Sequence, residues 1–479
     1  MICRILSAVL LFQLGTCLSA DEPFTKQQGA KALAKAVSFF REHVSTSGGY
    51  LWRYSHDLKL REGERRATST MVWVQPPGTP TVGDAYLRVF QLTGDKDYLE
   101  AARETANALV NGQLRSGGWG YSIEFDPTRR RAHAFRSDGG NSTGRNTTTL
   151  DDNTTQSALR FLMRVDRTLD FKDAKIHDAA IFALQSLLKS QYPNGAWPQR
   201  YSEFPDVSQF PVKKASYPKT WSRTWPDVDY RSHYTFNDNT ISDMIATMFE
   251  AADTYQDDRY RAAAEKAGGF ILLAQMPEPQ PIWAQQYDKD MHPAWARKFE
   301  PPAVTGGETR GVLRMLMSLY RRTGNAKYLK PIPRAIAYLK RSELPGGRMA
   351  RFYELKTNKP LYLTKDYQLT YSSDDMPTHY GFIVGGYVKS IEAEFERLKK
   401  TDPAKLKPRG YRVETAARLT PSLARSAKAV ADRLDDRGAW VEEGSLRAQG
   451  PDDATRRIIT TDTFAKNIVT LARFLSAKK

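Results

Sequence analysis

The chain has 479 residues, a formal net charge of +17 and a pI near 9.6. A chain of this length can bury a large core without disulfides, and its charge favours an acidic partner such as nucleic acid, anionic lipid or an acidic polysaccharide. It carries no RRM, zinc-finger or helix-turn-helix signature, which argues against a nucleic-acid-binding protein.

The first 20 residues predict a signal peptide. The apolar run Ile5–Leu14 is too short to span a membrane, and the small residues Ser19 and Ala20 precede a polar stretch. Both cysteines lie in this segment, so the predicted mature domain, residues 21–479, has none. No later segment is long and apolar enough to span a bilayer. We therefore expect a secreted or periplasmic monomer with one large domain.

Apolar residues recur at helical spacing along the rest of the chain. The clearest stretches are Thr155–Leu169, Ala180–Leu188, Ile241–Phe249, Val312–Leu319 and Phe464–Leu475. Short turns such as Thr93–Asp95 and Thr323–Asn325 link the halves of helical hairpins. The pattern predicts a chain of stacked helical pairs.

A turn that joins glycine to an aromatic residue repeats after these helical stretches. It appears at Gly48-Gly49-Tyr50, Gly117-Gly118-Trp119, Gly195-Ala196-Trp197 and Gly438-Ala439-Trp440, with looser copies near Trp283 and Phe352. Hairpins that each expose an apolar face can bury all of these faces in a closed ring. We predict an all-α fold, an α/α toroid with the aromatic turns at one mouth. An open solenoid is the alternative, but its terminal helices should be more polar than Phe464–Leu475.

Three long segments interrupt the helical pattern. Arg53–Pro80, Ile123–Arg145 and Glu203–His233 are rich in Pro, Ser, Asp and Arg, and they exceed the usual length of a connection. They are predicted to be loops over the cleft of the toroid.

Two acidic clusters stand where helices should begin, at Asp151-Asp152-Asn153 and at Asn237-Asp238-Asn239. Asp and Asn are favoured N-cap residues, so helix capping is one interpretation. The other is a metal site, because two such helix starts on neighbouring hairpins would bring carboxylate and amide oxygens together. These are ligands that suit Ca²⁺.

Two similar segments place an arginine beside aromatic residues and a glutamate. They are Ala296-Arg297-Lys298-Phe299-Glu300 and Ala350-Arg351-Phe352-Tyr353-Glu354. A surface cation stacked on a ring would explain them. An arginine fork also binds carboxylates bidentately, and a polyuronate carries one carboxylate per sugar.

Five motifs together resemble the family 10 pectate lyases, which cleave polygalacturonate by β-elimination. In chain order they are Asn194–Tyr201, Thr235–Asp238, Trp283–Asp288, Ala296–Arg297 and Ala350–Glu354. The resemblance implies a helical toroid-like fold, dependence on Ca²⁺, an acidic polysaccharide as substrate and an arginine as the base.

The resemblance also implies roles for individual residues. Arg297 matches the arginine that abstracts the proton, Arg351 matches a substrate-binding arginine, and Asp238 matches a calcium ligand. The family's second calcium ligand aligns with Asp151 when the sequences are compared without gaps. The asparagine that follows Asp152 favours Asp152 instead. We therefore predict both as metal ligands. Further substrate contacts are predicted at Trp197, Trp283, Tyr353 and Asn237.

An arginine base needs an unusual environment. A guanidinium has a pKa above about 12, so Arg297 could act as a base only where neighbouring cations and desolvation lower that pKa.

Two other functions fit the same residues. A uronyl glycoside hydrolase on an α/α toroid could use two of the three carboxylates Asp151, Asp152 and Asp238 as acid and base. A non-catalytic polysaccharide-binding protein could stack sugar rings on its tryptophans, namely Trp119, Trp197, Trp283 and Trp440.

Overall fold

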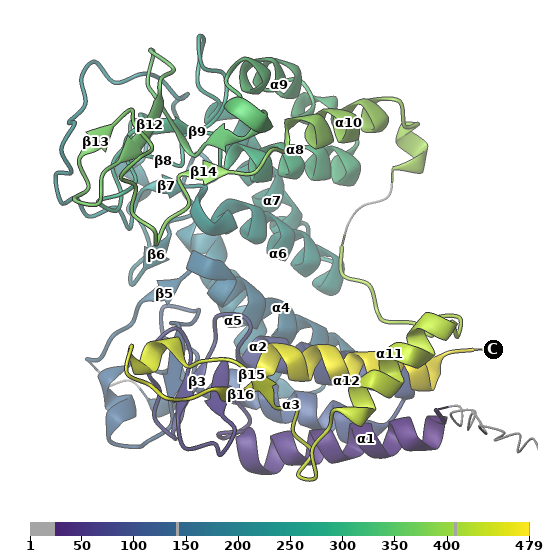
Figure 1. Cartoon of the computed structure of the whole chain (residues 1–479). Helices are drawn as coiled ribbons and strands as arrows, with labels where there is room; N and C mark the ends of the chain where they lie inside the picture. The colour runs from purple at the N-terminus through teal and green to yellow at the C-terminus, as the bar shows by residue number, and fades with distance from the viewer. Residues whose placement is uncertain (1–23, 140–142, 407–409, 479) are drawn as a thin grey trace, which may run out of the picture.

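The computed structural model describes residues 24–139, 143–406 and 410–478. Helices make up most of its regular structure (Figure 1). The predicted signal peptide lies outside the described residues. Within them, no helix combines the length and the hydrophobicity that crossing a bilayer requires.

The described residues form α-helices close to where helical spacing predicts them. They are α1 (Lys26–Phe39), α2 (Thr79–Thr93), α3 (Lys96–Asn111), α4 (Thr154–Thr168), α5 (Ala174–Ser190), α6 (Thr240–Tyr255), α7 (Asp258–Leu273), α8 (Thr309–Thr323), α9 (Ile332–Arg341), α10 (Val388–Lys399), α11 (Pro421–Asp432) and α12 (Thr461–Ser476). Each of the five predicted stretches lies within one helix, to within one residue. These helices are α4, α5, α6, α8 and α12. The prediction of a mainly helical fold is confirmed.

The connections between helices contain short strands that the sequence pattern did not predict. They are β1 (Arg53–Ser55), β2 (Arg61–Glu62), β3 (Met71–Trp73), β4 (Ser122–Glu124), β5 (Thr148–Thr149), β6 (Arg200–Tyr201), β7 (Tyr234–Thr235), β8 (Gln286–Tyr287), β9 (Ala303–Thr305), β10 (Met349–Ala350), β11 (Phe352–Glu354), β12 (Pro360–Leu363), β13 (Leu369–Thr370), β14 (Ile383–Val384), β15 (Glu442–Glu443) and β16 (Arg457–Thr460). The fold is therefore not purely helical, and the predicted loops at Arg53–Pro80 and Ile123–Arg145 are partly strand. Such strands are too short to show an alternating pattern.

The strands pair antiparallel in small sheets. Two sheets have four strands, in the orders β15-β16-β1-β2 and β13-β12-β11-β9, and the two-stranded pairs are β3-β4, β5-β6, β7-β8 and β10-β14. Figure 1 shows the strands gathered on one side of the molecule and the helices on the other. Functional residues on these connections therefore lie on a common side.

The helices pack in a row of neighbours. In that row α12 contacts α2, α2 contacts α4, α4 contacts α6, α6 contacts α8, and α8 contacts α10. Figure 1 shows two lobes, one with α1 to α5, α11 and α12 and the other with α6 to α10. The contact between α4 and α6 joins them. A cavity of about 770 Å³ is lined by α2, α4, α6, α8 and α12.

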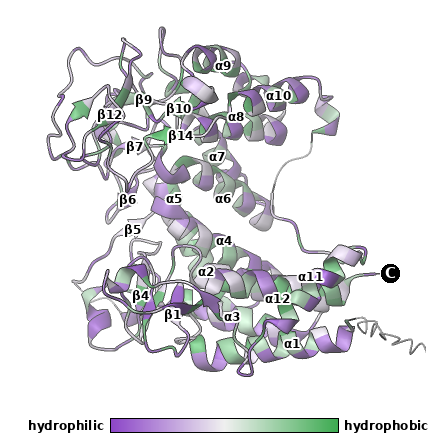
Figure 2. Cartoon of the chain, in the orientation of Figure 1, coloured by the Kyte–Doolittle hydropathy of each residue, from purple (hydrophilic) through white to green (hydrophobic). Residues whose placement is uncertain are grey.

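The helices are amphipathic, and Figure 2 shows polar and apolar residues alternating around them. In α4 the buried face includes Ala158, Leu159 and Leu162, whereas Arg160 and Arg164 line the cavity. Burying the apolar face against the neighbouring helices supplies most of the stabilisation of such a helix.

The glycine–aromatic turns have a structural role. The indole N–H of each of four tryptophans donates a 2.8 Å hydrogen bond to a carbonyl in the last turn of the preceding helix: Trp119 to Leu109, Trp197 to Leu187, Trp283 to Ile271 and Trp440 to Val430. The last four carbonyls of a helix have no partner within the helix, so each indole satisfies one of them.

The four tryptophans are only 0 to 4% exposed, so a sugar ring has no open indole face on which to stack. The prediction that Trp197 and Trp283 bind substrate is wrong. In the repeated turn the indole instead joins the end of a helix to the connection that follows it, through its hydrogen bond to a helix carbonyl. The polysaccharide-binding alternative loses the tryptophans on which it depended.

Replacing Gly195 with alanine should destabilise the protein strongly. Gly195 has a φ of +100°, and a Cβ there would lie 2.2 Å from the carbonyl oxygen of Lys266. Gly94 is a matched control, because its φ is +73° and a Cβ there would meet nothing within 4 Å. Denaturant unfolding should show that Gly195→Ala costs at least about 2 kcal/mol more than Gly94→Ala. Equal losses would show that the close approach to Lys266 is unimportant.

Candidate active site

Two turns of the same shape lead into α4 and α6. Asp152 and Asn153 have φ values of 50° and 58°, and Asp238 and Asn239 have φ values of 48° and 60°. Left-handed backbone costs most L-residues about 1–2 kcal/mol each, and Asp and Asn tolerate it best. This conformation explains why an Asp-Asn pair occurs in both turns. It also makes Asp152 the backbone equivalent of Asp238.

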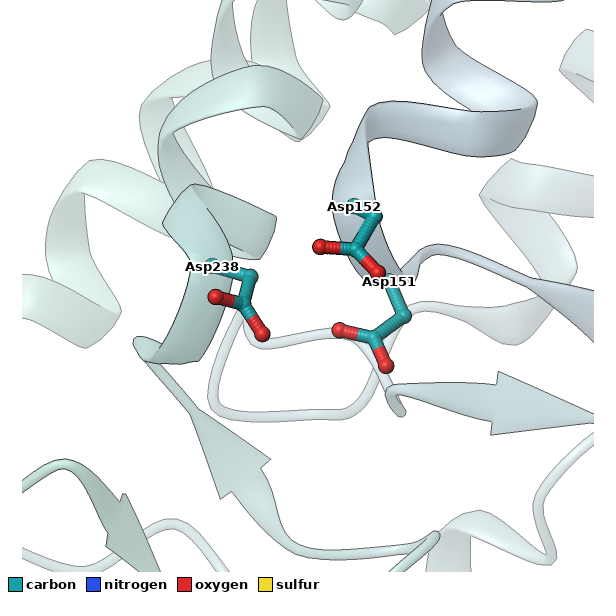
Figure 3. Close-up of side chains that lie close together, drawn as sticks. All are labelled: Asp151, Asp152 and Asp238. Carbon is teal, nitrogen blue, oxygen red and sulfur yellow. The ribbon is translucent and has the colours of Figure 1, made fainter. Parts of the chain in front are cut away.

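The helix-capping interpretation of these acids is wrong. The N-cap residues Asn153 and Asn239 make no side-chain hydrogen bond to their helices. Within the described chain, neither Asp152 nor Asp238 accepts a hydrogen bond from a helix N–H. The carboxylates instead point toward one another from two helices (Figure 3).

Asp151, Asp152 and Asp238 form a compact acidic cluster. One carboxylate oxygen from each lies within 4.8 Å of the others. Burial, reinforced by the charge of Asp151, raises the pKa of Asp152 to about 6. Burial and the charges of the other two acids raise the pKa of Asp238 to about 7. A divalent cation would relieve this repulsion, and a set of carboxylate oxygens is what Ca²⁺ prefers.

One carboxylate oxygen of Asp151 is held by hydrogen bonds, and the other has no partner among the described residues. Its Oδ2 accepts hydrogen bonds of 3.1 Å from the Tyr121 hydroxyl and from Nη2 of Arg200. Its Oδ1 is buried and has no hydrogen-bond partner among the described residues. A buried carboxylate oxygen with a free lone pair, facing two further acids, fits a metal ligand.

Arg297 reaches the acidic cluster from the connection after β8. Its Nη2 lies 3.9 Å from Oδ2 of Asp238 and donates a 2.6 Å hydrogen bond to Glu300 Oε1. Burial lowers the pKa of Arg297, but the hydrogen bond and the charge of Glu300 outweigh it and raise that pKa overall. Glu300 is 1% exposed and also accepts a 2.6 Å hydrogen bond from Gln285, so it holds the guanidinium in place.

Arg351 shares an aromatic ring with Arg297. The guanidinium carbons of Arg351 and Arg297 lie 4.6 and 5.9 Å from the centroid of Tyr380. Nη1 of Arg351 donates a 2.7 Å hydrogen bond to Glu308, the residue before α8. Burial, despite the nearby charge of Arg351, raises the pKa of Glu308 to about 7. The two predicted arginines therefore converge on one site.

The structure brings most of the predicted site residues together. It excludes Tyr353 from the site, in addition to the two tryptophans. Asp151, Asp152, Asp238, Arg297 and Arg351 meet at the junction of α4 and α6 with the strand side of the molecule. Asn237 is 4% exposed and donates a 2.5 Å hydrogen bond to Asp238, so it orients this acid.

Tyr353 is 1% exposed, and its hydroxyl donates to the carbonyl of Ser342 at 2.6 Å. The prediction that Tyr353 contacts substrate is therefore wrong, because its ring belongs to the core.

Several residues of the site escaped the sequence analysis, among them Arg200, Glu300, Glu308 and Tyr380. Arg200 and Glu300 stand inside the quoted motifs, directly after Trp-Pro-Gln and at the end of the Ala-Arg-aromatic segment. Glu308 and Tyr380 lie in no motif that we recognised. Their partners are distant in sequence, so only the fold reveals them.

Without metal, the protein should become less stable as the pH rises from about 4 to 7. Asp152 and Asp238 have pKa values of about 6 and about 7 in the folded protein, above those of an unfolded chain. The folded state therefore binds more protons than the unfolded state. The stability that this contributes is lost as the pH rises through the two folded-state pKa values. Melting temperatures in chelator should show the decline, with a smaller slope for Asp238→Asn. Equal slopes in both proteins would contradict this assignment.

The sequence itself matches a known family. Residues 120–386 match the sequence model of the pectic acid lyases, and this is more than half of the chain. The site that the helical fold builds is accordingly that of a polysaccharide lyase. The chain belongs to the pectic acid lyase family. No curated protein matches the sequence significantly.

Several solved structures are similar to this one over part or most of the chain. A family 10 polysaccharide lyase from Cellvibrio cellulosa is 23% identical, with a TM-score of 0.45 over 67% of this chain and 97% of that chain. A mutant of such a lyase from Cellvibrio cellulosa, in complex with trigalacturonic acid, is 22% identical with a TM-score of 0.46 over 67% and 98%. An α-mannanase from Bacteroides thetaiotaomicron is 10% identical with a TM-score of 0.40 over 94% and 95%. These similarities are too low to transfer an activity, so the assignment rests on the family match.

Proposed function

We propose that this lyase cleaves polygalacturonate or a related polyuronate by Ca²⁺-dependent β-elimination, with Arg297 as the base. The observation that carries the proposal is the convergence of three carboxylates and two arginines at one site. A polyuronate would bring its own carboxylates to this site, and both the cation and the arginines would bind them.

Asp151, Asp152 and Asp238 would hold the calcium ion through their carboxylate oxygens. When bound, Ca²⁺ would neutralise the substrate carboxylate and so acidify the C5 proton of that sugar. Arg200 would keep Asp151 in place through their 3.1 Å contact, and Asn237 would do the same for Asp238. Arg351 would bind a substrate carboxylate with its guanidinium fork.

In the proposed reaction Arg297 removes the proton from C5. The bond between C4 and its glycosidic oxygen then breaks, a double bond forms between C4 and C5, and the departing oxygen takes up a proton. The reaction needs Arg297 in its neutral form, and Glu300 opposes this by raising its pKa. We therefore expect the activity to increase toward alkaline pH.

Incubation of the purified protein with polygalacturonate and Ca²⁺ at alkaline pH tests the proposal. Elimination creates a conjugated double bond, so ultraviolet absorbance should rise, and a chelator should stop the rise. A uronyl hydrolase would instead remove the absorbance of unsaturated oligomers. Absence of any change with polyuronates would overturn the proposal.

We also infer that the row from α12 to α10 is part of an α/α toroid and that the protein is exported as a monomer. The contacts between alternate helices support the toroid, and the apolar run before Ser19 supports export. N-terminal sequencing of protein recovered outside the cytoplasm should start at or next to Asp21. Recovery of an uncleaved chain would contradict export through a signal peptide.

A further inference from the structure

A group of three aromatic rings lies directly beside Arg297. The ring of Phe299 lies 5.0 Å from His379 and 6.3 Å from Tyr367, and His379 lies 5.9 Å from Tyr367. We refer to Phe299, Tyr367 and His379 as the ring cluster. Phe299 also lies 4.8 Å from Tyr380, on which both site arginines stack. The cluster is thus continuous with the active site.

The ring cluster is partly exposed to solvent. Phe299 and Tyr367 are only partly buried and His379 is exposed, unlike the core tryptophans. Stacking on sugar rings needs aromatic faces that are held in place yet accessible, because a hexose presents an apolar C–H face. The cluster meets this requirement, whereas Trp197 and Trp283 do not.

A lysine adds a positive charge to the same surface. Nζ of Lys298 lies 3.9 Å from the centroid of the Tyr367 ring, and Lys298 is exposed. In the described parts of the chain it forms no ion pair and no hydrogen bond. Nearby cations differ in this respect, since Arg223 pairs with Glu354 at 2.5 Å and Lys365 with Asp375 at 3.0 Å. Lys298 therefore has its charge available for a ligand.

We propose that the ring cluster and Lys298 bind the uronate residue next to the one that reacts, which rests on the proposed function. Phe299 is close enough to receive the adjacent sugar, because the guanidinium carbon of Arg297 lies 4.9 Å from its ring centroid. The rings would pack against the sugar, and Lys298 would pair with its carboxylate. The chain length that the enzyme prefers is then set partly by this surface.

Cleavage of oligogalacturonates of increasing length tests the subsite. Lys298→Ala and Tyr367→Ala should each lower kcat/KM on the longer oligomers by about tenfold, mainly through KM, and affect the shortest cleaved oligomer less. Lys298→Arg should retain most of the activity. Lys389→Ala removes an exposed lysine on α10 and serves as the matched control.

The carboxylate contact has a separate test. Methyl esterification of the sugars beyond the reacting one should abolish the effect of Lys298→Ala and leave that of Tyr367→Ala. If the wild-type protein cleaves oligogalacturonates and neither variant changes the dependence on length, the subsite is refuted. If the wild-type protein cleaves no polyuronate, the proposed function itself fails.

Discussion

Arg297→Lys should lower kcat for elimination by about a thousandfold, within the range expected for loss of a general base. Lysine keeps the positive charge and the backbone N–H that donates to Glu300, but it cannot reproduce the guanidinium, whose Nη2 donates to Glu300 and lies 3.9 Å from Asp238. The initial rate of absorbance increase at saturating polygalacturonate measures the effect.

Arg103→Lys is the control for this substitution. Arg103 also pairs with an aspartate, Asp173, at 2.8 Å, but it lies on α3 outside the site. It should leave kcat unchanged, and both variants should melt close to the wild-type temperature. A fully active Arg297→Lys protein would exclude Arg297 as the base.

Asp238→Asn should weaken calcium binding and lower kcat/KM by at least about a hundredfold at limiting Ca²⁺. The substitution removes one of three carboxylates that face each other within 4.8 Å, and an amide binds the cation less strongly. Because Asp152 is the backbone equivalent of Asp238, Asp152→Asn should have a similar effect. Calorimetric titration with Ca²⁺ and activity at several Ca²⁺ concentrations measure both.

Asp243→Asn provides a control on α6, the helix that follows Asp238. Asp243 lies one turn further along α6 and faces Arg160 at 3.8 Å. This variant should bind Ca²⁺ like the wild-type protein. Unchanged calcium affinity in both Asp152→Asn and Asp238→Asn would contradict the assignment of the metal site.

Asp151 should behave differently from the other two acids. Its carboxylate accepts from Arg200 and Tyr121, so Asp151→Asn would also leave the partly buried guanidinium of Arg200 without its counterion. We expect this variant to lose thermal stability as well as calcium affinity, because a partly buried charge that loses its partner destabilises the folded state.

The acids and arginines of the site could be predicted from sequence because their chemistry is visible in the residue type. Asp-Asn pairs before helices offer hard oxygen ligands, and repeated Ala-Arg-aromatic segments offer cations for a polyuronate. The tryptophans could not be judged in this way. A Gly-aromatic turn does not tell whether its indole caps a helix carbonyl or faces a ligand, and here the burial of the four indoles decides for the first role.

The supporting residues were harder to predict for a different reason. Tyr380 meets Arg297 and Arg351 from a later segment of the chain, and Glu308 meets Arg351 across the β9–β11 pair. The contacts depend on how connections fold back over one side of the molecule. Periodicity along the chain carries no information about that arrangement.

The sequence by itself determined the helical pairs, the acidic helix starts and the family, because apolar spacing and side-chain chemistry are local properties. The tertiary structure decided that Asp152 corresponds to Asp238, because both share the left-handed backbone that precedes their helices. It also decided that the tryptophans belong to the core, and that a ring cluster with Lys298 borders the site. Burial and convergence depend on packing between distant segments, and a linear pattern cannot specify them.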